Sequence, residues 1–600
     1  MLQERKVAVI LSVFFFLSLC FVAFLGIIYV KIITPRKLPT LEVTKIDTAL
    51  RGSIFSSDNF ELAASSKLYK ASINTQSIDP QKRELFVNLF SIYSGIPTSE
   101  VYKKFQAQGN VVLSYRLSPS VATNLRRLNL ILLRYDVFRE YENAKGVVIP
   151  KQGLTIQVSG INRSYPYSSV LEPLIGYVKK NEIDGITRVY GLKGVEKYYN
   201  EILSSKQDGL ISGKRDIGFN VIMDKSAVKK LRQDGFNITL SIPLRVQHKL
   251  EMILDRAKAR YNVQEVIAGV MDSQSGRFLA LGSSNRFNPN TLRSLQDYSV
   301  LNLSAIERVY EPGSTIKPII YSILLEKNMI NPKQVFDLEG GVVKIKNYTI
   351  RDSTLVKNAT PEEILLKSSN IGMVKLSASL DSQSLHTALK AFGFSDITGI
   401  DLPYEKKGSL PSVRRLNIEE ATKATLSYGY GLQTTFIQIM RAYASFSNGG
   451  FLITPRVTQY ISAPSTERYI APTPQPLQIL SPHNAQKMQE LLIDVVQKGT
   501  GKPASVEGVI VGGKTGTAKI AKDGSYIDKY NGSFFGFAKD SQKTYTIGVV
   551  VFESHIQNDY YGSRTAAPIF KEIVEMLVNE GYLKPQNAQN AQSALEVQDS

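Results

Sequence analysis

Three short polar clusters in the second half of the 600-residue chain have the residue types and spacing of a serine acyltransferase. They are "SSN" and the two stretches "EPGSTIKP" and "GGKTGTA", which contain S-x-x-K and K-T-G. An S-x-x-K, an S-x-N and a K-T-G in this order place a nucleophile, a proton relay and a substrate strand along one chain. The S-x-x-K and S-x-N patterns also occur elsewhere, as in "SAVK" at 226–229 and "SSN" at 283–285, so the order of the three motifs carries the interpretation. The candidate catalytic residues are Ser314, Lys317, Ser368, Asn370 and Lys514.

The third cluster also fits a different chemistry. From Gly508 to Thr515, "GVIVGGKT" spells the phosphate-binding loop G-x-x-x-x-G-K-T. Such a loop needs a helix that begins at its Lys-Thr pair, yet Gly516 would interrupt that helix, and the β-branched residues 509–511 do not suit a glycine-like loop. We therefore expect a strand over 509–520 and no nucleotide site.

A serine hydroxyl becomes a nucleophile only when a base removes its proton. Lys317 follows Ser314 by one helical turn and can share its face. A free lysine has a pKa of about 10.4, and lowering it by about three units requires about 4 kcal/mol. The positive end of the helix, partial burial and a second cation, Lys514, would all lower this pKa. We expect Ser368 to relay the proton and Asn370 to hold the lysine and a substrate carbonyl.

The expected strand at 509–520 suits an extended peptide. Gly516 would allow a peptide to add to the strand edge, and Lys514 with the hydroxyls of Thr515 and Thr517 would hold a terminal carboxylate. The backbone N–H groups of Ser314 and Thr517 are natural oxyanion donors. The predicted substrate is a peptide with a free C-terminal carboxylate.

These motifs, together with four further segments, resemble the class B penicillin-binding proteins. This family comprises membrane-anchored, monofunctional D,D-transpeptidases that cross-link peptidoglycan, and the chain is more similar to its cell-division member than to its elongation member. The resemblance covers about 45–580. The further segments are "RSYPYSSVLEPLIGYV" (163–178), "GLKGVEKYY" (191–199), "YGYGLQTT" (428–435) and "FFGFA" (534–538).

The resemblance implies Ser314 as the acylated nucleophile, Lys317 as the base, Ser368 and Asn370 as the second motif, and Lys514 to Thr517 as the substrate strand. It also implies covalent inhibition by β-lactams and no cofactor or metal. The implied partners are peptidoglycan stem peptides or their lipid-linked precursor, a glycosyltransferase and other division proteins. One segment departs from the family pattern: residues 51–59 read "RGSIFSSDN", without the usual Asp-Arg pair.

Residues 7–30 are uncharged, apolar and longer than the about 20 residues that cross a bilayer as a helix. They predict a transmembrane anchor, since a cleaved signal peptide would have a shorter core and a small-residue cleavage site. Flanking charges do not decide the orientation. Peptidoglycan is built outside the cytoplasmic membrane, which would place 1–6 inside and 31–600 outside.

The expected fold class is α+β. Apolar runs on either side of 272–276 and of 539–543 predict two hairpins, and helical stretches at 316–327, 361–380 and 434–447 lie between them. This order predicts a central antiparallel sheet covered by helices, preceded by an elongated N-terminal α+β module. The expected divisions are a cytoplasmic tail at 1–6, an anchor at 7–30, a non-catalytic partner-binding domain at 31–240, a transpeptidase domain at 241–582 and a disordered tail at 583–600.

Composition excludes several other classes. With 43% hydrophobic and 21% charged residues the chain is folded, and 600 residues need at least two cores. The net charge of +19 is spread without a nucleic-acid signature, so we expect no nucleic acid. One cysteine, Cys20, excludes internal disulfides, and the four scattered histidines argue against a structural zinc and a His-dependent triad.

Alternatives stay open within and outside this chemistry. A D,D-carboxypeptidase or a β-lactamase would use the same three motifs but transfer the acyl group to water. An elongation-type transpeptidase would differ in cellular role only. From another class, a non-catalytic division scaffold would keep the fold and lack the reaction.

Overall fold

The computed structural model describes most of the chain, in the ranges 2–33, 42–142, 146–183, 186–216, 221–294, 298–346, 348–463, 467–470, 472–522, 525–555 and 559–585. The chain divides into two compact units. One contains Met1–Asp47 and Asp208–Arg232, and the other contains Thr48–Gln207 and Gln233–Ser600.

The first unit contains the apolar helix α1 (Leu2–Ile33). Its segment Arg5–Ile33 has a mean hydropathy of 2.8 and is the one helix of the described residues long and apolar enough to cross a membrane. The unit also contains a small antiparallel sheet, in the order β1 (Glu42–Asp47), β10 (Gly209–Lys214) and β11 (Val228–Lys230). This helix agrees with the predicted anchor.

The N-terminal part of the second unit is built on a nine-stranded sheet, in the order β23-β22-β12-β2-β3-β7-β9-β8 with β4 paired to β3. Helices α2 (Arg83–Ser94), α3 (Thr98–Lys104) and α4 (Pro119–Arg134) enclose a separate core with β3 and β4. Two strands come from the second half of the chain, so this sheet is not formed by the N-terminal segment alone. The strands are β2 (Ile54–Phe55), β3 (Glu61–Asn74), β4 (Asn110–Leu117), β7 (Thr155–Ser164), β8 (Val178–Ile183), β9 (Ile186–Gly191), β12 (Asn237–Leu240), β22 (Thr458–Ser462) and β23 (Arg468–Tyr469).

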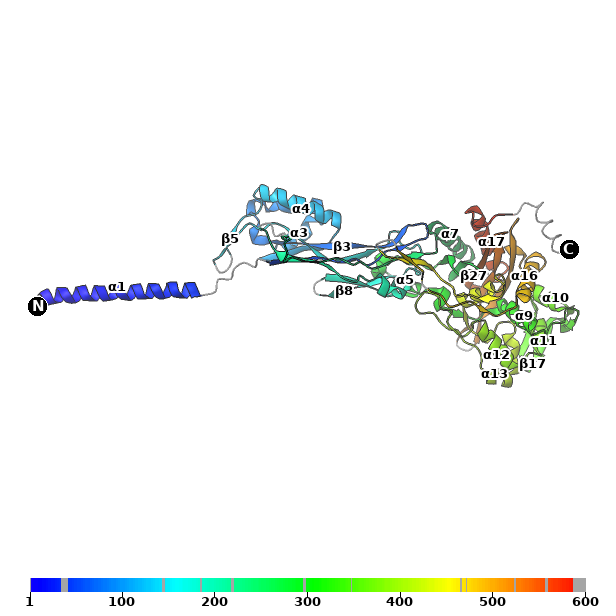
Figure 1. The fold of residues 1–600 in the computed structure, drawn as a ribbon. Helices are drawn as coiled ribbons and strands as arrows, with labels where there is room; N and C mark the ends of the chain where they lie inside the picture. The colour runs from blue at the N-terminus through cyan, green and yellow to red at the C-terminus, as the bar shows by residue number, and fades with distance from the viewer. Residues whose placement is uncertain are drawn as a thin grey trace. The chain divides into compact units, whose positions relative to one another are not determined.

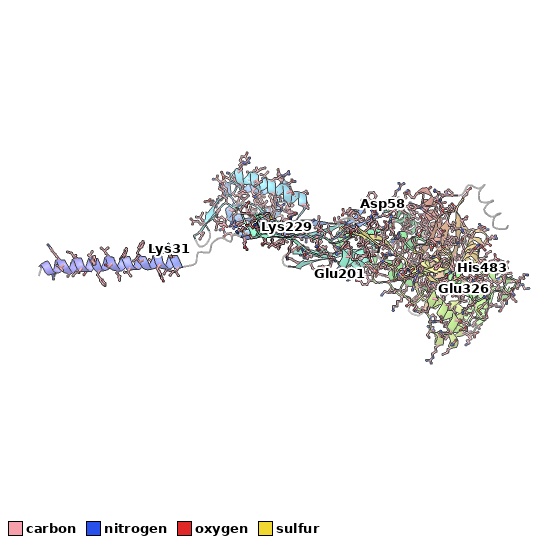
Figure 2. All side chains as sticks on the ribbon, in the orientation of Figure 1. Lys31, Asp58, Glu201, Lys229, Glu326 and His483 are labelled. Carbon is pink, nitrogen blue, oxygen red and sulfur yellow. The ribbon has the colours of Figure 1, made fainter. Side chains whose placement is uncertain are left out.

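The unusual segment 51–59 is firmly held. The buried guanidinium of Arg51 pairs with Glu196 at 2.8 Å, and Glu196 also pairs with Arg163 at 2.6 Å. A Cβ on Gly52 would lie 1.9 Å from the carbonyl oxygen of Phe236, so only glycine fits. Asp58, which Figure 2 labels, accepts a hydrogen bond from the backbone N–H of Leu244 at the start of α7 (Leu244–Tyr261) at 2.9 Å and so caps that helix. The segment therefore connects the N-terminal domain to α7, the first helix of the catalytic half.

The catalytic half contains the predicted central antiparallel sheet. Its order is β14-β13-β27-β26-β25, and both predicted hairpins are present: β13 and β14 turn at 273–277, and β26 and β27 turn at 540–543. The strands are β13 (Glu265–Asp272), β14 (Phe278–Ser283), β25 (Ile510–Lys522), β26 (Ser525–Lys539) and β27 (Thr544–His555).

Helices cover both faces of this sheet because its strands are apolar on both sides. Successive residues of a strand point to opposite faces: Phe534 packs on Phe570 of α17 (Ala566–Asn579), and Phe535 packs on Phe436 of α15 (Phe436–Ala444). Figure 1 shows α17 next to α7 (Leu244–Tyr261) and β27. The α+β fold class is confirmed.

Two helices that contact each other support the segments that carry the reactive residues. Helix α9 (Lys317–Glu326) ends at Glu326, whose carboxylate accepts hydrogen bonds from the N–H (3.0 Å) and hydroxyl (3.1 Å) of Ser481. Ser481 caps α16 (Pro482–Gln497), which packs along β25, and Figure 2 shows Glu326 beside His483 of that helix. This contact joins the helix that follows the S-x-x-K turn to the helix that supports the K-T-G strand.

Two sequence-based boundaries differ from the structure. The predicted helix at 361–380 is broken into α10 (Pro361–Leu366) and α11 (Asn370–Ser377), because Ser368 has a left-handed backbone with φ of 56°. At the C-terminus, Leu583 is buried against the core that contains α17, although the predicted tail starts there. Residues 586–600 of that tail lie outside the described residues.

Candidate active site

Ser314 lies on a tight turn that leads into a helix. The 3-10 turn Gly313–Ile316 runs directly into α9, with Pro318 in its first turn, where a missing N–H costs nothing. Gly313 has φ of 57°, and a Cβ there would lie 3.2 Å from the carbonyl oxygen of Thr517. This conformation lets the nucleophile turn approach β25 closely, as the sequence predicts for a serine between a turn and a helix.

Lys317 has a fully buried side chain whose Nζ lies among uncharged partners. It donates to the carbonyl oxygen of Ser368 at 2.6 Å and to Oδ1 of Asn370 at 2.8 Å, and it lies 3.3 Å from the Ser368 hydroxyl. Burial holds the pKa of this ammonium well below its ordinary value, and the nearby charge of Lys514 lowers the pKa further. Both effects favour the neutral amine over the ammonium, while the charge of Asp352 acts in the opposite direction.

A neutral amine has two N–H donors and one lone pair. The Ser368 carbonyl and the Asn370 side chain take both donors, so the lone pair is free to accept a proton from a hydroxyl. Among the hydrogen bonds of the described residues, none joins Nζ to the Ser314 hydroxyl. Catalytic hydrogen bonds often shorten only when substrate is bound.

The second motif is a strained turn held by a carboxylate that the sequence analysis missed. Asp352 accepts hydrogen bonds from the Ser369 hydroxyl and the Asn370 N–H, each at 2.5 Å, and from the Ile371 N–H at 3.2 Å. The Asn370 amide donates to the carbonyl of Arg351 at 2.8 Å, which points its Oδ1 at Lys317. Asp352 thus fixes the start of α11 and, through it, the lysine.

Lys514 is the second fully buried lysine of the site. Its Nζ contacts the carbonyl oxygen of Thr515 at 3.2 Å, the Thr515 hydroxyl at 3.3 Å and the Thr500 hydroxyl at 3.5 Å. Burial lowers its pKa to about 7. The Thr500 and Thr515 hydroxyls lie 3.1 Å apart, so Thr500 completes this cluster although no sequence motif marks it.

The K-T-G residues lie on β25, which occupies an edge of the five-stranded sheet. Because Lys514 lies within a strand and no helix begins there, the phosphate-loop alternative is excluded. A Cβ on Gly516 would lie 2.8 Å from Cγ2 of Thr315, so glycine permits the close packing of the strand against the nucleophile turn. The Thr517 hydroxyl accepts a hydrogen bond from the Gly562 N–H at 3.0 Å, which orients it.

The structure thus brings all three predicted motifs together. Lys317 directly joins the first motif to the second through Ser368 and Asn370, and the nucleophile turn packs on the third. A further buried contact supports the nucleophile turn: the Tyr443 hydroxyl donates a hydrogen bond to the carbonyl oxygen of Thr315 at 2.7 Å.

A serine on a turn that leads into a helix, a buried lysine one turn later and a K-T-G edge strand define a serine acyltransferase of the S-x-x-K class. Comparison with known proteins agrees with this class. The model of the penicillin binding protein transpeptidase domain matches residues 266–575, and that of the penicillin-binding protein dimerisation domain matches residues 46–240. The chain belongs to the penicillin-binding protein transpeptidases and, with its N-terminal dimerisation domain, to the class B proteins of the FtsI type.

Individual relatives span most of the chain. Stage V sporulation protein D of Bacillus subtilis is 32% identical over 71% of this chain and 65% of its own length. The peptidoglycan D,D-transpeptidase FtsI of Escherichia coli K12 is 29% identical over 70% of this chain and 68% of its own length. The FtsI of Buchnera aphidicola (Schizaphis graminum) is 26% identical over 98% of this chain and 99% of its own length.

Solved structures share the fold at lower identity. Penicillin binding protein 2X from Streptococcus thermophilus superposes with a TM-score of 0.71 at 20% identity, covering 91% of this chain and 83% of that one. Penicillin binding protein 3 from Mycobacterium tuberculosis, complexed with aztreonam, gives a TM-score of 0.63 at 23% identity, covering 90% and 98%.

Proposed function

We propose that the chain is a peptidoglycan D,D-transpeptidase that joins stem peptides through an acyl-enzyme on Ser314. The observation that carries this proposal is the fully buried Lys317, whose Nζ is held by the Ser368 carbonyl and the Asn370 side chain and whose pKa is lowered by that burial. The family supports the reaction class, and the buried lysine supplies the base that a serine nucleophile requires.

In the first half-reaction, Lys317 accepts the Ser314 proton while Oγ attacks the carbonyl carbon of the penultimate D-Ala. The backbone N–H groups of Ser314 and Thr517 stabilise the oxyanion. The bond to the terminal D-Ala nitrogen then breaks, and the proton passes from Lys317 through the Ser368 hydroxyl, 3.3 Å away, to the leaving amine. An ester on Ser314 and a free D-Ala result.

In the second half-reaction, an amine of another stem peptide attacks the ester. Its proton returns through the same lysine to Ser314, so one amide bond is lost and one is formed. Lys514, with the hydroxyls of Thr515 and Thr517, holds the donor carboxylate, and Gly516 lets the donor add to β25 as a strand. A β-lactam has a strained amide and a carboxylate, so it would occupy the same positions and stay attached.

The cellular assignment is part of the same proposal. Residues 1–6 lie in the cytoplasm, 7–30 span the inner membrane, 31–240 bind partners, 241–582 catalyse, and the end of the chain is a flexible tail. The FtsI type supports septal synthesis with a glycosyltransferase and other division proteins. Localising a fluorescent fusion tests this, because signal along the side wall instead of at midcell would assign an elongation role.

Fluorescent penicillin and mass spectrometry of the intact protein test the chemistry. The expected result is one stable adduct on Ser314 that is absent in Ser314→Ala. The matched control is Ser226→Ala, an exposed serine in the chain's other S-x-x-K sequence, which should label normally. Rapid loss of the adduct would instead identify a hydrolase. Full complementation of a depletion strain by Ser314→Ala would leave only the scaffold function.

A further inference from the structure

A small pocket opens beside the buried ion pairs of the N-terminal domain. Its volume is about 230 Å³, below the about 300 to 1,000 Å³ of pockets that hold drug-sized ligands. Arg51, Arg188, Ser204 and Ser205 contribute to its lining. No aspartate or glutamate is among the described residues that line it. The size and the composition of the pocket therefore suit a small anion.

The ion pairs beside this pocket contain more positive than negative charge. Glu196 pairs with Arg51 at 2.8 Å and with Arg163 at 2.6 Å, and each of the three side chains is at most 2% exposed. Arginine stays protonated in proteins, so two cations share one carboxylate. In the described ranges of the chain, the buried Nη2 of Arg163 has no hydrogen-bond partner, so the cluster also holds an unused donor group.

Two further titratable side chains close to Glu196 do not balance this charge. Burial, together with the charges of Glu196 and Glu251, raises the pKa of Glu172 well above its ordinary value, which favours the neutral acid. Burial likewise raises the pKa of the Tyr165 hydroxyl, which lies 3.4 Å from the Glu196 carboxylate and stays uncharged. An excess charge inside a protein is costly unless an opposite charge pairs with it.

Arg51 connects this excess charge to the pocket. Its Nη1 donates to Oδ1 of Asn200 at 3.0 Å and to the Ser204 hydroxyl at 3.3 Å. The second contact is longer than the about 2.7 to 3.2 Å of ordinary N–H···O bonds, so an oxygen of a bound anion could replace the hydroxyl as the acceptor. Arg188 of β9 adds a second guanidinium, and Ser205 adds a second hydroxyl. The planar fork of a guanidinium matches the oxygens of phosphate groups.

We propose that this pocket binds a small oxyanion of the phosphate class, held by the guanidiniums of Arg51 and Arg188 and by the hydroxyls of Ser204 and Ser205. The bound anion supplies the negative charge that the ion pairs lack. Arg163 of the same cluster donates to the carbonyl of Gly52 at 2.8 Å, so the anion also stabilises the buried start of segment 51–59. The inference does not depend on the proposed function, because none of these residues belongs to the three catalytic motifs.

Isothermal titration calorimetry of the full chain in detergent tests the inference. Sodium phosphate is the first probe and dimethyl phosphate is the second, with chloride holding the ionic strength constant. We expect one saturable site for phosphate. Binding of the inorganic ion alone would assign the site to free phosphate, whereas equal or tighter binding of dimethyl phosphate would assign it to a phosphodiester group of a larger molecule. Absence of saturable binding of both probes would overturn the inference.

Variants show whether binding occurs in this pocket. Arg188→Gln should weaken phosphate binding about tenfold or more, the scale of one charge-assisted hydrogen bond, and Ser205→Ala should weaken it less. The matched control is Arg116→Gln, an exposed arginine on β4 of the same sheet that does not line the pocket, and it should bind as the wild type does. An unchanged far-ultraviolet circular dichroism spectrum shows that each variant folds. Wild-type affinity in Arg188→Gln, or an equal loss in Arg116→Gln, would overturn the assignment to this pocket.

Discussion

Replacing Lys514 by methionine should stabilise the fold while it impairs the reaction. The side chain is fully buried without a carboxylate partner, and burial lowers its pKa from 10.5 to about 7. The unfolded chain therefore binds a proton more tightly than the folded protein does. This difference opposes folding at every pH below the unfolded pKa.

The magnitude follows from the size of that pKa difference. At about 1.4 kcal/mol per unit, the destabilisation is about 5 kcal/mol at pH 7 or below, and it disappears as the pH rises to 10.5. Methionine removes this term but leaves the Thr500 and Thr515 hydroxyls without the Nζ, which costs about 1 to 3 kcal/mol. Burial outweighs the lost contacts, so we expect a net gain of about 2 to 4 kcal/mol at pH 7.

Urea unfolding of the catalytic half at pH 7 and pH 10 measures this change. At pH 10 the burial term is below about 1 kcal/mol, so the gain seen at pH 7 should become a loss of about 0 to 2 kcal/mol. Penicillin acylation should fall because methionine does not pair with the ligand carboxylate. Lys502→Met, at an exposed position nearby, should change the free energy of unfolding by less than about 0.5 kcal/mol. A loss of stability at pH 7, or a gain that does not shrink with pH, would refute the reasoning.

Three further perturbations test other parts of the site. Lys317→Met should abolish acylation of Ser314. In the wild-type protein the acylation rate should fall as acid protonates Lys317, because only the neutral amine accepts a proton; a rate that stays constant down to the pH at which the protein unfolds would argue against this base. Asp352→Asn should lower acylation about tenfold or more, since it weakens charge-assisted hydrogen bonds of about 1.5 to 3 kcal/mol, with an unchanged far-ultraviolet circular dichroism spectrum as the control. Gly429→Ala should lower the melting temperature and the acylation rate together, because its Cβ would lie 2.0 Å from the carbonyl oxygen of Gly313; an unaffected melting temperature would show that the turn adapts.

Much of the site could be predicted because its chemistry resides in short motifs. S-x-x-K needs one helical turn, and a K-T-G strand needs one edge, so the roles expected for Ser314, Lys317 and Lys514 follow from local spacing. The central sheet could also be predicted from the sequence, since its strands are continuous apolar runs that end in recognisable turns.

The residues that escaped prediction act through contacts distant in sequence. Asp352 is 17 residues from Ser369 and belongs to no motif, yet its carboxylate fixes the second motif. Thr500 reaches Lys514 only because α16 returns the chain to β25. The break at Ser368 was missed because helical periodicity continues through it, and only the tertiary contacts reveal the left-handed residue.

Asp58 shows that a missing motif need not mean a missing function. The segment 51–59 lacks the family's Asp-Arg pair, and in this chain the Asp58 carboxylate caps α7 while Arg51 forms the buried pair with Glu196. A buried ion pair that loses one partner is strongly destabilising, because the other charge remains buried. The N-terminal domain and the catalytic half are thus joined through segment 51–59. Its exposed end at 58–59 tolerates a change of sequence, whereas its buried start at 51–52 does not.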